Sequence, residues 1–173
     1  MLLSAITRRL VIASATLGGL SQVADRALVG TPGLRKLGPE FWVQYSSHAD
    51  LGTGVVLYPI AYIGWTALAV AAAITHRRGG RTPRRATVPI YLAAVCMLGV
   101  MALTAKAAPI MLGIGKLETE AEMQHAFDQF TFWGIYVRGA LITIAFIASV
   151  WALAVLPPVT SRDEAIAKAK VSS

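Results

Sequence analysis

The sequence is poor in the residues from which most enzyme sites are built: it has one cysteine, three histidines and nine acidic residues in 173. A single thiol, Cys96, excludes a disulfide within the chain and any CxxC redox or zinc motif. No glycine-rich phosphate loop and no serine, histidine and acid motif is present, and the GIG triplet at 113–115 is typical of a turn after a helix. The common signatures of soluble enzymes are therefore missing.

Apolar residues, in contrast, make up 55% of the chain, and the mean hydropathy is +0.59. This composition is typical of one membrane-embedded domain and not of a soluble protein of the same length. Two apolar runs of about 25 residues lie at 51–75 and 88–112. At 1.5 Å per residue, each run is long enough to cross a hydrocarbon core of roughly 30 Å. The two runs predict a transmembrane helical hairpin.

The segment HRRGGRTPRRAT at 76–87 connects these runs and contains five arginines. Because positive residues concentrate in cytoplasmic loops, we place this hinge in the cytoplasm. With four spans, that side holds ten Lys or Arg residues and two acidic residues, against four and seven outside. The net charge of +7 therefore indicates topology and no nucleic-acid partner, since the basic residues sit at span ends without interleaved aromatic residues.

Two further apolar segments complete the predicted fold class, an all-α, four-helix transmembrane bundle with its N and C termini in the cytoplasm. The helices are expected near residues 10–29, 51–75, 88–112 and 131–156, in a membrane domain at 1–157 that a polar tail at 158–173 follows. Residues 1–30 also fit a cleaved signal peptide, because an arginine pair precedes a short apolar core. We expect an integral, multi-pass protein of the plasma (inner) membrane.

Two segments are expected on the outer side. Residues 31–50 combine helix breakers with Phe41, Trp42 and Tyr45, and such aromatic residues favour the headgroup level, so this segment is expected to lie on the outer surface. Residues 119–128 contain no glycine or proline. A helix is therefore expected to begin there, before the fourth span, and to run into it.

Small and aromatic residues in the second span point to helix packing. Glycines and a run of alanines allow neighbouring helices to approach closely. Tyr58, Tyr62 and Trp65 recur at helical spacing. Packing inside the bundle is the simple interpretation of that series.

Ionisable residues gather toward the outer end of the predicted bundle, whereas the inner halves of the spans are almost wholly apolar. Because polar groups are expensive in a membrane, such residues are candidates for a functional site. The residues in the outer third are Asp25, Arg26, His48, Asp50, Lys106, His125, Asp128 and Arg138. They either form a pocket or pair with one another and fix the order of the helices, and the sequence leaves both alternatives open.

Two histidine and aspartate pairs, His48 with Asp50 and His125 with Asp128, have the chemistry of a metal site. Their spacing is unspecific and histidines at helix entrances are common on surfaces, so we favour an interfacial polar network and assign no metal. At 100° per residue, His125, Asp128 and Tyr136 share one helical face, and Arg138 lies about 80° away from Asp128.

Three stretches, GTPGLRKLGPEFW, YSSHADLGTGVVLYP and FDQFTFWGIYVRGAL, carry a family resemblance. Across roughly residues 10–155 the chain resembles the anthrone oxygenase-like family of small four-helix membrane proteins. This resemblance implies a four-helix membrane fold and the oxidation of a hydrophobic compound that is aromatic or quinone-like. It implies family-like positions at Trp133 and Arg138, together with His48 and Asp50.

The resemblance and the clustered polar residues together suggest roles. His125 and His48 are candidate bases for a phenolic or carbon acid, and Arg138 and Lys106 are candidates to stabilise the resulting anion by charge. Candidate substrate-binding residues are Asp50, Asp128, Trp133 and Tyr136. No cofactor is indicated. Expected partners are membrane lipid, a hydrophobic small molecule, and a second copy or another membrane subunit.

Two alternative functions remain. The first is a noncatalytic subunit that uses its small-residue helix faces and its acidic outer loop to bind a larger complex. The second is a transport path, which is disfavoured because the four spans show no inverted repeat and the polar residues stop at the outer third.

Overall fold

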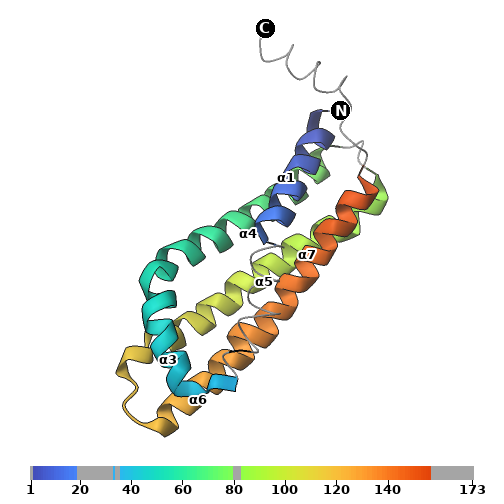
Figure 1. Ribbon diagram of the computed structural model, residues 1–173. Coiled ribbons are helices and arrows are strands. Elements are labelled where there is room, and N and C mark those ends of the chain that lie inside the picture. Colours follow the sequence, from blue (N-terminus) through green and yellow to red (C-terminus); the bar gives the residue numbers. More distant parts are fainter. Residues whose placement is uncertain (1, 19–32, 34–35, 80–82, 157–173) are drawn as a thin grey trace.

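The computed structural model describes residues 2–18, 33, 36–79 and 83–156. Over these ranges the chain forms helices and no strand. One short helix and three long helical rods run side by side (Figure 1). The prediction of an all-α, four-helix bundle is confirmed.

Each rod consists of helical segments that follow one another almost without interruption. The first rod contains α3 (Pro39–His48), the π-helix η2 (Ala49–Thr53) and α4 (Gly54–Arg78). The second contains η3 (Arg84–Ala86), α5 (Thr87–Leu112) and η4 (Ile114–Lys116). The third contains α6 (Glu120–Phe130), the π-helix η5 (Thr131–Val137) and α7 (Arg138–Val155). The short helix is α1 (Leu2–Gly18).

The three rods are each long and apolar enough to cross a membrane; they span Pro39–Arg78, Arg84–Lys116 and Glu120–Val155. Helix α1 begins at Leu2, eight residues before the expected start at residue 10. Residues 19–29 of that expected helix, with Asp25 and Arg26, lie outside the described residues.

The segment before η2 differs from the expectation of a turn-rich outer surface segment. Residues Pro39–His48 form α3, with Gly38 as the residue before the helix and Pro39 in its first turn. The two helix breakers therefore start the helix instead of interrupting it, since the first turn needs no donor from proline. Trp42, expected at the headgroup level, is fully buried.

Helix α6 begins where the sequence predicted a helix before the fourth span. Thr119 and Glu122 form a capping box: the Thr119 side chain accepts a bond from the Glu122 N–H, and the Glu122 carboxylate accepts one from the Thr119 N–H. This arrangement satisfies N–H groups that a helix start leaves without partners. The helix then continues through η5 into α7, as predicted.

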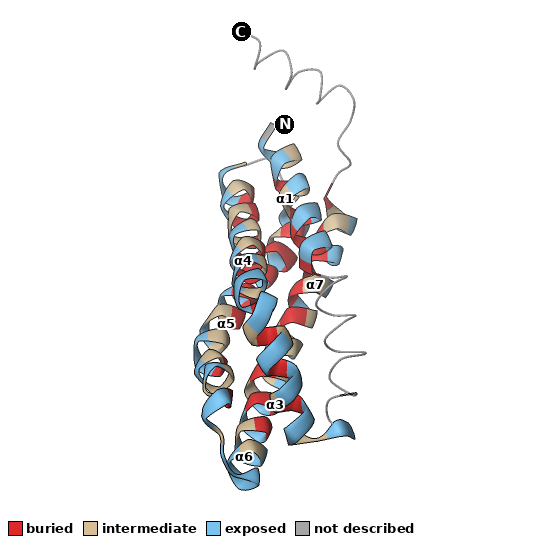
Figure 2. Cartoon of the chain, turned by 60° about the vertical axis from the view of Figure 1, so that its left-hand side comes forward, coloured by how far each residue is buried: buried red, intermediate tan, exposed pale blue. Residues whose placement is uncertain are grey.

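The inner half of the bundle, at the end that holds the arginine-rich hinge, is packed mainly by small residues. Helices α1, α4, α5 and α7 meet there around buried alanines and a few large side chains, including Trp65, Met97 and Val100. The Oγ1 atoms of Thr7 and Thr75 lie 2.9 Å apart, and Arg8 Nη1 donates to the Leu156 carbonyl at 2.7 Å. Figure 2 shows buried residues along the inward faces of these helices.

The outer half has a separate and smaller core. Trp42 of α3 packs between two rings of α6, at 5.6 Å from Phe127 and 5.5 Å from Phe130 between ring centroids. Ala107 of α5 and Ile114 of η4 complete this cluster. The aromatic contacts hold α3 and α6 against the end of α5.

Candidate functional site

A pocket of about 250 Å³ lies in the outer half of the bundle. Its wall comes from η2 and α4, from the second half of α5, and from the third rod near the start of α7. The lining residues are Asp50, Leu51, Gly54, Val55, Tyr58, Pro59, Tyr62, Ile63, Met101, Thr104, Ala107, Ala108, Met111, Leu112, Phe130 and Arg138. Most of this wall is apolar, and it includes one carboxylate and one guanidinium.

Two π-helical segments border the pocket. Segment η2 contains Asp50 and bends at Gly52, whose ψ of −116° is not helical. Segment η5 ends immediately before Arg138. Single-turn π segments interrupt the regular helix register and are frequent at functional sites. In this protein the two π segments position Asp50 and Arg138, the two charged residues of the pocket wall.

Two glycines make room for aromatic rings beside these segments. A Cβ atom at Gly134 would lie 3.1 to 3.3 Å from the Phe130 ring, and one at Gly54 would lie 2.6 Å from the Tyr58 ring. Phe130 and Tyr58 both line the pocket. The glycines therefore let aromatic rings pack where a larger residue would displace them.

Asp50 is 7% exposed. One of its carboxylate oxygens accepts a hydrogen bond of 2.8 Å from the Ser46 hydroxyl, which is itself buried one turn earlier. Hydrogen bonding offsets part of the cost of burying a carboxylate. Asp50 is thus held in a fixed position in the pocket wall.

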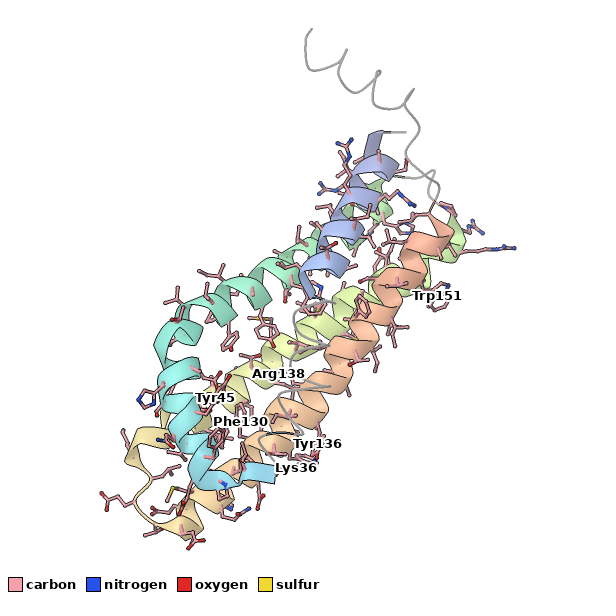
Figure 3. All side chains as sticks on the ribbon, in the orientation of Figure 1. Lys36, Tyr45, Phe130, Tyr136, Arg138 and Trp151 are labelled. Carbon is pink, nitrogen blue, oxygen red and sulfur yellow. The ribbon has the colours of Figure 1, made fainter. Side chains whose placement is uncertain are left out.

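Arg138 is half-buried and lies between the first and third rods. Figure 3 shows it between the ribbons of α4 and α7. Trp151, in contrast, lies on the side of α7 that faces away from the other helices. The Arg138 Nε donates a 3.0 Å bond to the Gly134 carbonyl. Its guanidinium carbon lies 5.3 Å from the centroid of the Tyr62 ring, within the range of a cation–π contact.

Lys106 and Trp133, two further predicted site residues, contact each other away from the pocket wall. The Lys106 ammonium lies 3.4 Å from the centroid of the Trp133 ring, and the Phe132 ring packs edge-on against the same indole at 4.8 Å. Lys106 is exposed, and neither Lys106 nor Trp133 lines the pocket. The structure therefore brings these two residues together but separates them from Arg138 and Asp50.

The remaining predicted site residues are exposed: His48, His125, Asp128 and Tyr136. His48 Nδ1 lies 2.9 Å from the Gln44 carbonyl. Asp128 accepts a 3.0 Å bond from the Gln124 side chain. None of the four lines the pocket, and their functional roles stay predictions.

His125, Asp128 and Tyr136, predicted to share one helical face, are each exposed on the third rod, and η5 interrupts the regular helix between Asp128 and Tyr136. Among the residues that the structure describes, no group of three or more His, Cys, Asp or Glu side chains is close enough to hold a metal ion. We favoured a polar network for these histidine and aspartate residues. The hydrogen bonds described for them are local ones, within one helix.

Sequence reasoning missed several pocket residues. Tyr62 and Trp65 pack in the core, as the helical spacing suggested. Tyr58 and Tyr62 also line the pocket, together with Met101 and Thr104 of α5. The sequence feature that could have indicated this pocket was the group of closely spaced glycines in the second span, next to the tyrosine series.

Comparisons with protein-family models, with curated proteins and with solved structures find no match for this chain. The pocket, its two charged wall residues and the π-helical segments beside it are therefore the basis for a functional hypothesis.

Proposed function

We propose that this chain is an integral membrane protein whose outer-end pocket binds a hydrophobic aromatic or quinone-like compound. The carrying observation is a mostly apolar pocket of about 250 Å³ with Asp50 and Arg138 in its wall. Small-molecule sites typically combine apolar walls with a few polar groups that orient the ligand.

The lengths of the three rods support a membrane-spanning arrangement, to which we assign four spans and both termini in the cytoplasm. Helix α7 has 18 residues from Arg138 to Val155, or about 27 Å at 1.5 Å per residue. In α5, Lys106 lies about 29 Å along the axis from Thr87. Both lengths are close to a hydrocarbon core of roughly 30 Å, so arginines at the inner surface put Arg138 and Lys106 near the outer boundary.

The pocket chemistry suits a ligand with an aromatic ring and oxygen substituents. Tyrosine and methionine side chains in the wall offer aromatic and polarisable contacts to a flat ring. Arg138 is placed to donate charge-assisted hydrogen bonds to a carbonyl or phenolate oxygen. Asp50 is placed to accept a bond from a hydroxyl group.

The oxidation implied by the family resemblance is part of the proposal, with dissolved dioxygen as the oxidant: a hydroquinone and dioxygen give the quinone and hydrogen peroxide. A positive charge in a site of low dielectric stabilises a bound phenolate, and the phenolate is oxidised more readily than the phenol. Asp50 lines the pocket, whereas His48 and His125 do not, so the geometry favours Asp50 as the base. The two histidines stay candidates that the variants below separate from Asp50.

The test is a binding and turnover assay of the purified protein in nanodiscs with an anthrone and hydroquinone panel. We expect at least one compound to bind, Arg138→Gln and Asp50→Asn to weaken it, and the surface variants Lys116→Gln and Glu120→Gln to bind normally. Parallel assays of His125→Ala and His48→Ala decide whether either histidine is the base. No binding by any compound, or unchanged binding by Arg138→Gln, would contradict the proposal.

A noncatalytic subunit is the second candidate, favoured by one observation. The start of α6 and the turn before it present three exposed carboxylates, Glu118, Glu120 and Glu122, at the end opposite the arginines. A basic protein surface would complement them. Copurification of a stoichiometric protein in mild detergent, with no bound small molecule, would support this function instead.

A further inference from the structure

The pocket wall is uneven in its exposure, and the exposed part lies on two helices. On α4, Val55 and Ile63 are 46% and 55% exposed, and on α5 Leu112 is 62% exposed. Of the charged wall residues, Asp50 is buried and Arg138 is half-buried. The pocket therefore has an apolar mouth and a more polar interior.

The mouth is bordered by two parallel stripes of side chains. Val55, Pro59 and Ile63 follow one another at intervals of four residues, so they lie along one face of α4. On α5, Ala108 and Leu112 have the same spacing. An opening between these stripes faces sideways from the bundle, not toward its end.

The surface around this opening is strongly apolar. Val56 and Ile60 of α4, which do not line the pocket, are exposed next to the first stripe, and Leu57 is exposed on the far face of the same helix. In the membrane arrangement proposed above, exposed aliphatic residues of this kind contact lipid chains. The Ile63 end of the mouth therefore opens to hydrocarbon, and the Leu112 end, which lies beyond Lys106 on α5, is at the outer boundary of the membrane.

The size of the pocket limits what can fit inside it. Ligand pockets of drug-sized molecules usually measure about 300 to 1,000 Å³, and this one has about 250 Å³. That volume accommodates a substituted ring but not a ring with a long chain. Among the described residues, the exposed apolar part of the wall lies between the two stripes, where a chain attached to the ring would leave the pocket.

We infer that the ligand is a membrane amphiphile with a quinone-like head and a long apolar tail, and that it occupies the pocket through a lateral portal between α4 and α5. The head contacts Arg138 and Asp50, and the tail passes between Ile63 and Ala108 into the bilayer. This inference rests on the proposed function, because it assigns the class of ligand for the same pocket.

The experiment compares two probes in nanodiscs: a tail-less methyl-substituted benzoquinone and the same ring with a decyl tail. Affinities are expressed against the membrane concentration of each probe, which removes the effect of simple partitioning. Ile63→Trp narrows the portal, and Ile60→Trp is its matched control, because Ile60 is 63% exposed on the same helix and does not line the pocket.

We expect Ile63→Trp to weaken binding of the decyl probe about tenfold more than binding of the tail-less probe, because an added ring overfills the passage that the tail needs. Ile60→Trp should change neither affinity. Ala108→Phe, with Ala105→Phe as its control, repeats the test from α5, in case the tryptophan variant does not fold.

Three outcomes separate the two proposals. Equal binding of both probes by the wild type, or portal variants that bind the decyl probe normally, would overturn the lateral portal and leave the pocket function intact. Equal weakening of both probes by Ile63→Trp would show a general distortion of the pocket and would also overturn the portal. If neither probe nor any compound of the panel binds the wild type, the proposed function fails and the portal fails with it.

Discussion

The inner and outer halves of the bundle use the same helices in different ways. In the inner half, α4, α5 and α7 stay close because alanines meet at their interfaces, and α1 fills the remaining side. In the outer half, larger aromatic residues replace alanines, and a pocket separates α4 from α5. Close packing of helices requires small residues at each helix interface. A cavity forms where one helix bends away from the helices beside it.

The structural cause of this difference lies in irregular helix segments. Helix α5 is continuous from Thr87 to Leu112, with Pro109 inside its last turn, and forms part of both halves. The first rod contains Pro59 and the bend at Gly52, and the third rod contains η5. Proline and π segments are recognised causes of helix kinks. The pocket lies at the level where both rods depart from regular α-helix.

The largest expected effect is on the inner core. Trp65 is 1% exposed, and Trp65→Ala should lower the free energy of unfolding by about 3–5 kcal/mol because it leaves a cavity. Trp151 is 48% exposed, and Trp151→Ala should change the free energy of unfolding by about 0.5 kcal/mol or less. Denaturation in mixed micelles measures both. Similar losses for the two variants would mean that the inner half is not a specifically packed core.

The next effect is on ligand binding in the outer half. Arg138→Gln should weaken binding of the best compound by about 10- to 100-fold, because a hydrogen bond from a charged group contributes about 1.5–3 kcal/mol. Arg138→Lys should restore part of the loss by restoring the charge. Isothermal titration with the anthrone and hydroquinone panel measures these affinities. A glutamine variant that binds as well as the lysine variant would exclude a role for the charge.

A smaller pair of effects compares two glycines on the third rod. Gly134→Ala should lower stability by about 1 kcal/mol and reduce ligand binding, because the added Cβ presses on the Phe130 ring. At Gly139 no heavy atom lies within 4 Å of the built Cβ, so Gly139→Ala should raise stability by up to about 1 kcal/mol through helix propensity. Unfolding and binding measurements on both variants check the opposite signs.

The smallest effect concerns the contact between α1 and α4. A double-mutant cycle with Thr7→Val and Thr75→Val should give a coupling energy of about 0.6 kcal/mol, the average for hydrogen bonds between membrane helices. Unfolding of the two single variants and the double variant measures it. A coupling near zero would mean that the 2.9 Å contact does not help to hold α1 in place.

The sequence predicted the long helices well because apolar runs of about 25 residues have few other structures available to them. It also predicted the helix that begins after Thr119, because residues 119–128 contain no glycine or proline, whereas the capping box there was found in the structure. It did not predict α3, because glycine and proline were interpreted as interruptions and Gly38 and Pro39 instead start that helix. Local signals predicted local structure.

The candidate site was predicted less well, because the direction in which a side chain points depends on how the helices pack against one another. Asp50 and Arg138 were selected as ionisable residues near the outer boundary, and both line the pocket. The same criterion selected His48, His125 and Lys106, which are exposed. Tyr58 and Tyr62 were interpreted as packing residues, since the sequence does not show that η2 and η5 would open a space beside them.

The most direct measurement of the central claim is native mass spectrometry of wild-type protein and the Arg138→Gln variant, both purified gently from the same membranes. The account predicts that the wild type retains a lipophilic compound with an oxygen-substituted ring and that Arg138→Gln releases it, while Lys116→Gln retains it. A wild-type protein that carries no such compound, or an Arg138→Gln variant that carries it in equal amount, would contradict the account.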